Sequence, residues 1–372
     1  VFVTMRDGVK LCVDIYRPQT KARVPALLAF AVYNKDMMAP ETARALGPQP
    51  AFAPLWTGYL ESGDTQYLTS RGYAHVVASP RNFAKSESGG SREWDSYDLI
   101  EWLAQQDWCD GNIGMVGISG FGAEQFNAAK QQPPHLKAIF PFDPRGAYGK
   151  LGSFREEYPG GVLHVFRYLI SLNVNMHENK GAPKPLSPER ERLWQLAMQN
   201  PEYRMYPHIY NVVTMKGQHL PMVFELLINP YDDETAVQRA DDDFAKVTIP
   251  AYTGSGWYGY SYKTHLNGAQ SWFARLLSPK KMLLGGPAHV ERPFHTLHGE
   301  MLRWFDHWLK GIDSGMLAEA PVRYWSMGEN RWREGADWPL PETQWTKLYL
   351  TSWGRLRKDP VTPQSAYAQQ EP

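Results

Sequence analysis

A serine flanked by glycines is the residue in this sequence best suited to nucleophilic chemistry. Ser119 lies in the segment GMVGISGFG, between Gly117 and Gly120, with Gly122 beyond. A serine that must stand clear of a sheet on a tight turn needs small neighbours, and a helix that begins there directs free N–H groups at a developing oxyanion. The pattern is G-x-S-x-x-G, so an ordinary glycine-rich turn with a serine N-cap is the alternative.

The segments around Ser119 predict the elements that such a turn requires. NIGMVGIS (112–119) is strand-like, AEQFNAAKQ continues as a helix, and LKAIFPFDP (136–144) is again strand-like. The apolar runs VPALLAFAVY (24–33) and GYAHVVASP (72–80) have the pattern of strands buried on both faces. Strands that alternate with helices predict an α/β fold with a doubly wound, mostly parallel sheet.

The alternation begins after a short hairpin and is interrupted once. The hairpin is predicted at Asp7-Gly8, a strong turn signal between two short strands. After about residue 147, Pro/Gly breaks and helical stretches such as PERERLWQLAMQ replace the buried strands, which indicates an inserted helical cap. Strands resume with IPAYTGSGW and KKMLLGGPAH, and an amphipathic helix follows at 299–312. The predicted units are the first part of the core (1–147), the cap (148–247), the second part of the core (248–320) and a β-like, Trp/Pro-rich segment (321–372).

Composition excludes several classes of partner. Lys and Arg number 39, and Asp and Glu also number 39, so no basic field is available for nucleic acid. No apolar run reaches the roughly 18 residues of a membrane-spanning helix, so we expect no membrane association. Low cysteine use, with only Cys12 and Cys109, favours a cytoplasmic protein without a disulfide framework. The sequence opens on Val1, so a removed leader stays an alternative. A homo-oligomer also stays open.

Three histidines near the end of the predicted core invite a metal interpretation. His289, His295 and His298 lie within ten residues, with five and two residues between them. These spacings do not put three ligands on one helix face, and no carboxylate or cysteine motif joins them. We therefore expect no metal.

Ordered motifs run through most of the chain outside the predicted cap. They include MRDGVKLCVDIYRP, SRGYAHVVASPR, DSYDLIEWLAQQDWCDGNIGMVGIS, GGPAH and LRWFDHWLKGID. Together they resemble the X-Pro dipeptidyl-peptidase and cocaine esterase family of α/β-hydrolases. The resemblance implies a serine hydrolase of esters or amides that needs no cofactor, with an inserted helical cap and a C-terminal jelly-roll domain. The sequence stops soon after TKLYLTSWGRL, so we expect most of the jelly roll to be absent from it.

The resemblance also implies roles for particular residues. Ser119 matches the family's nucleophile, and His289 in GGPAHV matches the base that takes the serine proton and returns it to the leaving group. Tyr33 in VYNK matches the tyrosine whose hydroxyl forms the oxyanion hole with the backbone N–H of Gly120. An acyl-enzyme that water releases is then expected. The cap (148–247) is rich in Tyr, Phe, Leu and Met, which favours an apolar or aromatic acyl group.

The acid of the triad is missing from its place in the family pattern. The segment aligned with GSGWYGY carries an aspartate directly after Trp-Tyr in the family, and Gly259 stands there in this sequence. The protein is then inactive, works with a weak Ser–His dyad, or takes its acid from elsewhere; loss of the acid costs on the order of 10⁴ in kcat. The strand LKAIFPFDP ends on Asp143, near the expected histidine loop, and we predict Asp143 as the acid. A turn, a helix cap or pairing with Arg145 is the alternative for this side chain.

Two other functions stay open at this level. One is a catalytically silent binding protein that lost its acid at Gly259, and the other is transfer of the acyl group to an acceptor other than water. The silent alternative has no need of Ser119, His289 and Tyr33 together, and all three are retained. A hydrolase acting on a small-molecule ester or amide is therefore the preferred prediction.

Overall fold

The computed structural model describes most of the predicted core and parts of the remaining chain. The described residues are 1–31, 33–39, 59, 61–144, 186–207, 210, 214, 228, 243–257, 264–285, 293–351 and 354–360. The strands are β1 (Phe2–Thr4), β2 (Lys10–Tyr16), β3 (Val24–Phe30), β4 (Ala74–Ala78), β5 (Cys109–Ile118), β6 (Leu136–Phe142), β7 (Ala251–Ser255), β8 (Lys280–Leu284), β9 (Val322–Ser326), β10 (Arg331–Gly335), β11 (Tyr349–Leu350) and β12 (Leu356–Arg357). The α-helices are α1 (Lys35–Met38), α3 (Thr65–Thr69), α4 (Asp95–Ala104), α5 (Gly120–Lys130), α8 (Pro188–Gln199), α9 (Pro201–Met205), α13 (Thr264–Arg275) and α14 (Pro293–Lys310).

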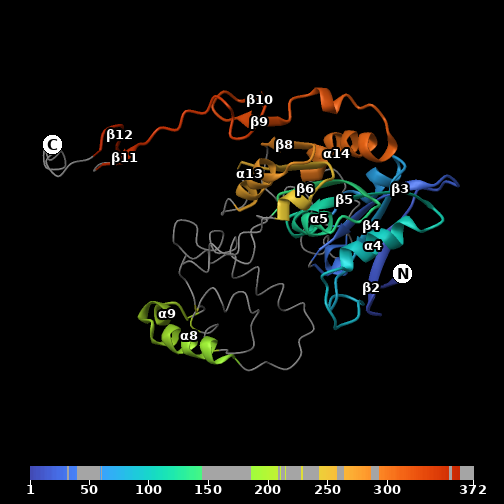
Figure 1. The fold of residues 1–372 in the computed structure, drawn as a ribbon, viewed down its shortest axis with the longest axis horizontal. Helices are drawn as coiled ribbons and strands as arrows, with labels where there is room; N and C mark the ends of the chain where they lie inside the picture. Colours follow the sequence, from blue (N-terminus) through green and yellow to red (C-terminus); the bar gives the residue numbers. More distant parts are fainter. Residues whose placement is uncertain are drawn as a thin grey trace, which may run out of the picture.

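A ten-stranded mixed sheet organises the described residues. Its strand order is β1-β2-β4-β3-β5-β6-β7-β8-β9-β10 (Figure 1). Neighbours from β4 through β9 pair in parallel, whereas the strands at both edges pair antiparallel. All seven residues of β3 are buried between parallel β4 and β5, which confirms the prediction of a strand covered on both faces. The predicted α/β-hydrolase type of sheet is therefore present.

Successive residues of β3 serve two different cores. Leu28 belongs to a cluster that includes Ile100 of α4 and Phe126 of α5. Leu27 belongs to another cluster, which includes Trp304 and other residues of α14. Because neighbouring side chains of a strand point to opposite faces, α4 and α5 cover one face of the sheet and α14 covers the other. The strands are thus held rigidly from both sides.

The hairpin and helix predictions compare well with the structure. β1 and β2 pair antiparallel across Asp7-Gly8, where Gly8 has a φ of +88°, so the predicted hairpin is confirmed. The helix expected at 299–312 begins earlier, at Pro293, and ends at Lys310. The helix α13 was not predicted. None of the helices in the described ranges is both long and apolar enough to cross a lipid bilayer.

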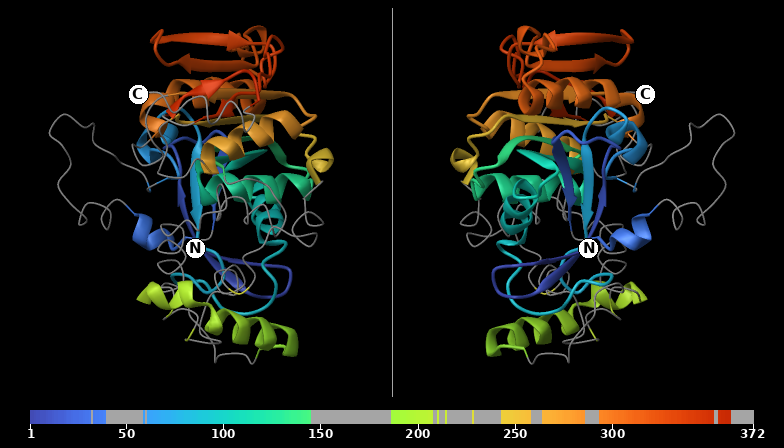
Figure 2. Two further views of the ribbon diagram at one scale, coloured as in Figure 1. Left: turned by 90° about the vertical axis from the view of Figure 1, so that its left-hand side faces the viewer. Right: turned by 90° about the vertical axis from the view of Figure 1, so that its right-hand side faces the viewer.

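Parts of the predicted cap and of the C-terminal segment are described. The helix expected in PERERLWQLAMQ is confirmed as α8, and most of the rest of 148–247 lies outside the described residues. β9 continues the main sheet by pairing in parallel with β8, while β11 and β12 form a separate two-stranded sheet. Figure 2 shows α8 and the β9–β10 hairpin at opposite ends of the molecule. The boundaries of the cap stay a prediction.

A buried histidine on β4 fixes the loop that supports the end of β5. Nε2 of His75 lies 3.1 Å from the carbonyl oxygen of Ser62, so this nitrogen carries the proton, and Nδ1 accepts from the Thr65 hydroxyl at 2.9 Å. One residue before Ser62, the carbonyl oxygen of Glu61 accepts the N–H of Ile118 at 2.9 Å. Burial lowers the pKa of His75 to about 4, so the imidazole is neutral at neutral pH.

We predict that His75 makes the fold sensitive to acid. The unfolded chain binds a proton at an ordinary pKa of 6.5, and the folded chain binds it only near pH 4, so stability is lost as the pH falls through this window. Each unit of pKa difference corresponds to about 1.4 kcal/mol. Urea unfolding in steps from pH 6.5 to pH 4 should show a flatter pH dependence for His75→Gln than for wild type. Parallel curves would contradict the assignment.

Candidate active site

The backbone of Ser119 adopts a conformation that few residues other than glycine adopt. The residue lies between the end of β5 and the first turn of α5, with φ at 58° and ψ at −112°. Its N–H donates to the carbonyl oxygen of Phe142 on β6 at 3.1 Å, and its own carbonyl oxygen accepts the N–H of Ala123 at 2.9 Å. Within the described part of the chain, the Ser119 side chain caps no N–H of α5, so the N-cap alternative does not fit. A strained backbone and a side chain that does not cap the helix are the features expected of a nucleophilic serine on a strand-to-helix turn.

The glycines around Ser119 are required by close contacts. A Cβ at Gly117, where φ is +139°, would overlap the Cβ of Phe121. A Cβ at Gly120 would lie 2.9 Å from the hydroxyl oxygen of Tyr33, and one at Gly122 would lie 3.0 Å from a carbonyl oxygen at the end of β6. Side chains at these positions would displace the parts that surround the serine. The spacing G-x-S-G-x-G follows from packing on three sides of the turn.

A buried amide fastens the helix α5 to the two strands beneath it. Gln125 is fully buried; its Nε2 donates to the carbonyl oxygen of Gly117 at 3.2 Å, and its Oε1 accepts the N–H of Phe140 at 2.9 Å. These bonds join α5 to β5 and β6 on both sides of Ser119. Gln125 was not predicted from the sequence, where a single amide on the buried face of a helix is the only signal of its role.

Tyr33 lies beside the serine, as the family pattern implies. Its ring packs on Phe121, with ring centroids 5.4 Å apart, and its hydroxyl oxygen is 3.4 Å from the Oγ of Ser119. This distance exceeds the usual 2.7–2.8 Å of a hydroxyl–hydroxyl hydrogen bond. The ring also covers Gly120, whose N–H belongs to the first turn of α5. Two donors, the Tyr33 hydroxyl and the Gly120 N–H, therefore lie close to the Ser119 hydroxyl, an arrangement suited to stabilising an oxyanion.

Asp143 is buried at the carboxyl end of β6, one strand away from the end of β5. Its side chain is fully buried, and its backbone has a φ of +44°. Its N–H donates to the carbonyl oxygen of Gly254 on β7 at 2.7 Å, so Asp143 continues the pairing of β6 with β7. Full burial is unusual for an aspartate, and neither a turn nor a helix cap requires it. Arg145, the other partner considered for it, lies outside the described residues.

His289 and Gly259 also lie outside the described residues, but the strands that lead to them are described. The chain is described as far as Trp257 after β7 and as far as Gly285 after β8. Gly285 donates its N–H to the carbonyl oxygen of Ser255 at 3.0 Å, so these strands end side by side. Because parallel strands share a carboxyl edge, β3, β5, β6, β7 and β8 all lead towards one edge of the sheet. The sheet topology thus brings the segments that carry Tyr33, Ser119 and Asp143, and those that lead to Gly259 and His289, to the same edge.

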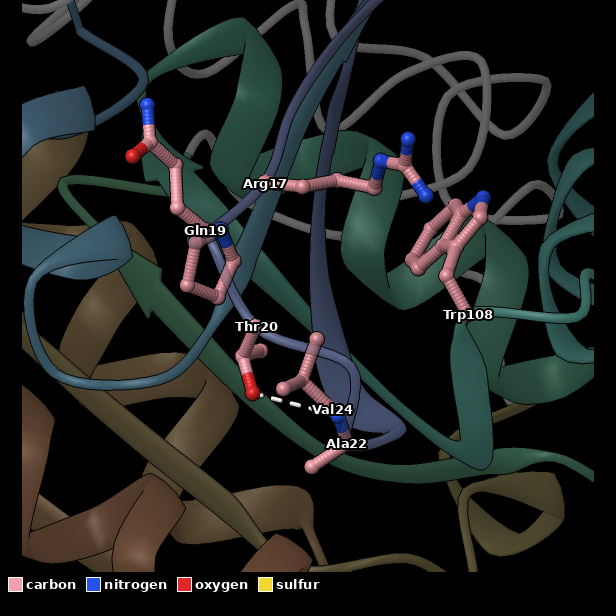
Figure 3. Close-up of a pocket in the computed structure, with 7 residues that line it drawn as sticks. Arg17, Gln19, Thr20, Ala22, Val24 and Trp108 are labelled. Atoms are coloured by element: carbon pink, nitrogen blue, oxygen red, sulfur yellow. Dashed lines mark hydrogen bonds between the residues drawn. The ribbon is translucent and has the colours of Figure 1, made fainter.

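A cavity of about 360 Å³ lies at the opposite edge of the sheet. Val24, the first residue of β3, and Trp108, just before β5, line it together with Arg17 and nearby loop residues (Figure 3). Both strands begin there and end near Ser119. The cavity is therefore separate from the candidate site.

Comparison with known proteins shows the family of this chain. The family model described as X-Pro dipeptidyl-peptidase (S15 family) matches residues 7–291, which is most of the chain and includes every candidate site residue. The chain belongs to this family. Curated relatives of this chain are named as esterases and as Xaa-Pro dipeptidyl-peptidases, so the family is one of hydrolases.

A curated relative and two solved structures show how far the similarity extends. Cocaine esterase from Rhodococcus sp. (strain MB1 Bresler) is 27% identical over 387 residues, covering 95% of this chain and 62% of that protein. The crystal structure of a CocE/NonD family hydrolase from Staphylococcus aureus matches with a TM-score of 0.66 and 23% identity, over 97% of this chain and 60% of the other. An aminopeptidase from a marine sediment Thaumarchaeota archaeon matches with a TM-score of 0.70 and 18% identity, over 96% and 62% of the two chains. These structures share the α/β-hydrolase fold, and the chain spans about three fifths of the length of its relatives.

We predict that the contact between Gly120 and Tyr33 limits substitution. Gly120→Ala should lower the free energy of unfolding by about 1–3 kcal/mol, because the new methyl group would overlap the Tyr33 ring. Gly299→Ala on α14 is the matched control: it places a methyl group in open space on a helix and should raise stability by about 0.5–1 kcal/mol. Urea unfolding of both variants measures the difference. An equal effect of the two substitutions would show that Tyr33 does not pack on Gly120.

Proposed function

We propose that this chain is a serine hydrolase that cleaves a carboxylic ester or amide through an acyl-enzyme. The proposal rests on the strained backbone of Ser119, whose side chain caps no N–H of α5 and whose Oγ lies 3.4 Å from the Tyr33 hydroxyl oxygen. Membership of a hydrolase family supports the same reaction class. In this proposal Ser119 is the nucleophile, His289 the general base, and Tyr33 with the Gly120 N–H the oxyanion hole.

The proposed reaction has two halves. Ser119 Oγ attacks the carbonyl carbon while His289 takes the hydroxyl proton, and the resulting oxyanion accepts hydrogen bonds from Tyr33 and the Gly120 N–H. The intermediate collapses, the bond to the leaving alcohol or amine breaks, and His289 gives the leaving group its proton. Water then attacks the acyl-enzyme with His289 as base, and a carboxylic acid and free Ser119 result.

Asp143 is proposed as the acid that orients His289. Its support is position and burial, because it follows the strand between those that carry Ser119 and lead to Gly259. An anion there would hold the imidazole in the tautomer that accepts the serine proton and would stabilise the imidazolium. Triads are defined by geometry rather than by the order of residues, so an acid after β6 can replace one after β7.

The proposed substrate is a small ester or amide with an apolar or aromatic acyl group. The support is the composition of the predicted cap, rich in Tyr, Phe, Leu and Met, together with the esterase among the curated relatives. A second candidate function rests on Gly259, because a chain without a replacement acid would be a weak or silent enzyme that keeps only a pocket. Kinetics of site variants separates these functions.

Substitution of the nucleophile and the base should show that the two act as one unit. Ser119→Ala and His289→Ala should each lower kcat for a p-nitrophenyl ester by a factor of about 10⁶, and the double variant should be hardly slower than either. Steady-state kinetics with thermal melts of every variant is the measurement. Near wild-type hydrolysis by folded Ser119→Ala would end the proposal.

Moving the carboxyl group from position 143, directly after β6, to position 259, beyond β7, tests the position of the acid. Asp143→Asn should lower kcat by a factor of about 10⁴, the loss expected when an imidazole loses its orienting anion. Adding Gly259→Asp to Asp143→Asn should partly restore kcat, because the family pattern places its acid there. If Asp143 is only structural, Asp143→Asn will lower stability without the kinetic loss, and Gly259→Asp alone will raise the activity of the otherwise unchanged protein.

A further inference from the structure

A buried ammonium group lies two residues after Tyr33. Lys35 begins α1, and only 4% of it is exposed. Its Nζ donates to Oδ2 of Asp14 on β2 at 2.8 Å and also to Oδ1 of Asp36 at 2.5 Å. The same Asp14 oxygen accepts the hydroxyl of Tyr59 at 2.5 Å. The charge of Lys35 is thus buried but paired with carboxylates from two different segments.

The surrounding groups keep Lys35 charged. Burial alone would lower the pKa of the ammonium, but the hydrogen bonds to Asp14 and Asp36 outweigh it, and the pKa of Lys35 is raised. Burial and the hydrogen bond to Asp14 raise the pKa of Tyr59, which therefore stays a neutral donor. A paired buried charge that loses one partner leaves the other uncompensated, so the pair holds its two segments together strongly.

The backbone of Lys35 is anchored as well. Its N–H donates at 3.0 Å to the Oγ of Ser79, a buried residue directly after β4. Ser86 donates its hydroxyl to the carbonyl oxygen of Ser79 at 2.9 Å and accepts the N–H of Cys12 on β2 at 2.8 Å. Lys35 is therefore fixed to β2 through its side chain and to β4 through its main chain.

Tyr33 stands between two fixed points of the chain. The last residue of β3 that pairs with β4 is Phe30, opposite Ala78, so Tyr33 lies beyond that ladder. Lys35 is anchored on the other side of Tyr33. The Tyr33 ring packs on Gly120 and Phe121, and its backbone lies between these two points.

We infer that the ion pair between Lys35 and Asp14 positions the Tyr33 hydroxyl for the oxyanion hole. Lys35 acts on Tyr33 through the backbone of Asn34, and Asp14 acts through Lys35, so both are positioning residues rather than catalytic ones. This inference rests on the proposed function, in which Tyr33 donates to the oxyanion. It gives the proposed site a support that comes from β2, a strand that carries no proposed catalytic residue.

A double-mutant cycle separates positioning from general stability. Lys35→Met should lower kcat for a p-nitrophenyl ester by about 10- to 100-fold with KM changed less than about twofold, because a misplacement of about 1 Å can cost 100-fold. Tyr33→Phe should lower kcat by about 100- to 1000-fold. In the Tyr33→Phe background, Lys35→Met should cause less than a further twofold loss, since no hydroxyl remains to be positioned.

Lys281→Met is the matched control. Lys281, the second residue of β8, lies away from the carboxyl edge of the sheet and is also buried, with 5% exposed. Its Nζ donates to the carbonyl oxygens of Met316 and Ala320. This variant should lower the melting temperature and leave kcat within about twofold of wild type. Asp14→Asn is the second test variant if Lys35→Met does not fold, because the Asp14 side chain is 30% exposed and tolerates the change more readily. It should show the same dependence on Tyr33.

Two results would overturn the inference. One is an equal loss of kcat from Lys35→Met, or from Asp14→Asn, in the wild-type and Tyr33→Phe backgrounds. The other is a loss of kcat from Lys35→Met that is no greater than the loss from Lys281→Met when the two variants are equally destabilised. Failure of the proposed function gives a different result, because Tyr33→Phe and Ser119→Ala would then leave hydrolysis unchanged in the otherwise wild-type chain.

Discussion

The left-handed backbone of Ser119 is the constraint on which the candidate site depends. A non-glycine residue at a φ of 58° is disfavoured by on the order of 1–3 kcal/mol and persists only where its surroundings fix it. Here the surroundings are Gln125, which ties α5 to β5 and β6, the Glu61 carbonyl that holds the N–H of Ile118, and Gly117, which leaves room for the next turn. Two hydrophobic layers on the faces of the sheet keep these parts from relaxing.

The parallel sheet brings other candidate site residues to the edge where the strained Ser119 lies. Parallel strands end at the same edge of a sheet. Residues that follow different strands, far apart in the sequence, therefore come close together there. The same arrangement supports the proposal that the acid follows β6 in this chain. Asp143 follows β6 and donates its N–H to Gly254 of β7, the strand that leads to Gly259. Because the ends of β6 and β7 are neighbours at one edge, the proposed acid could follow either strand while Ser119 keeps its place.

Much of the core could be predicted from the sequence, and the reasons are local. β3 is a continuous apolar run, β4 is apolar except for His75, the first hairpin has Asp7-Gly8, and Ser119 has its glycines beside it. The start of α14 and the whole of α13 were missed, although buried Leu266, Ala269 and Phe273 recur along α13 at helical spacing. Gln125 and the Lys35–Asp14 pair could not be predicted for a stronger reason. Their partners lie on other strands, and a polar residue shows its role only when the fold brings the partner to it.

The proposed mechanism requires that Ser119 be chemically activated, and covalent labelling by a fluorophosphonate measures that property directly. Mass spectrometry of the labelled, folded protein should find one adduct per chain, located on Ser119, and none in the His289→Ala variant, because an ordinary serine hydroxyl reacts far more slowly than one with a general base. An unlabelled protein, or an adduct on a different residue, would contradict the assignment of Ser119 as the nucleophile.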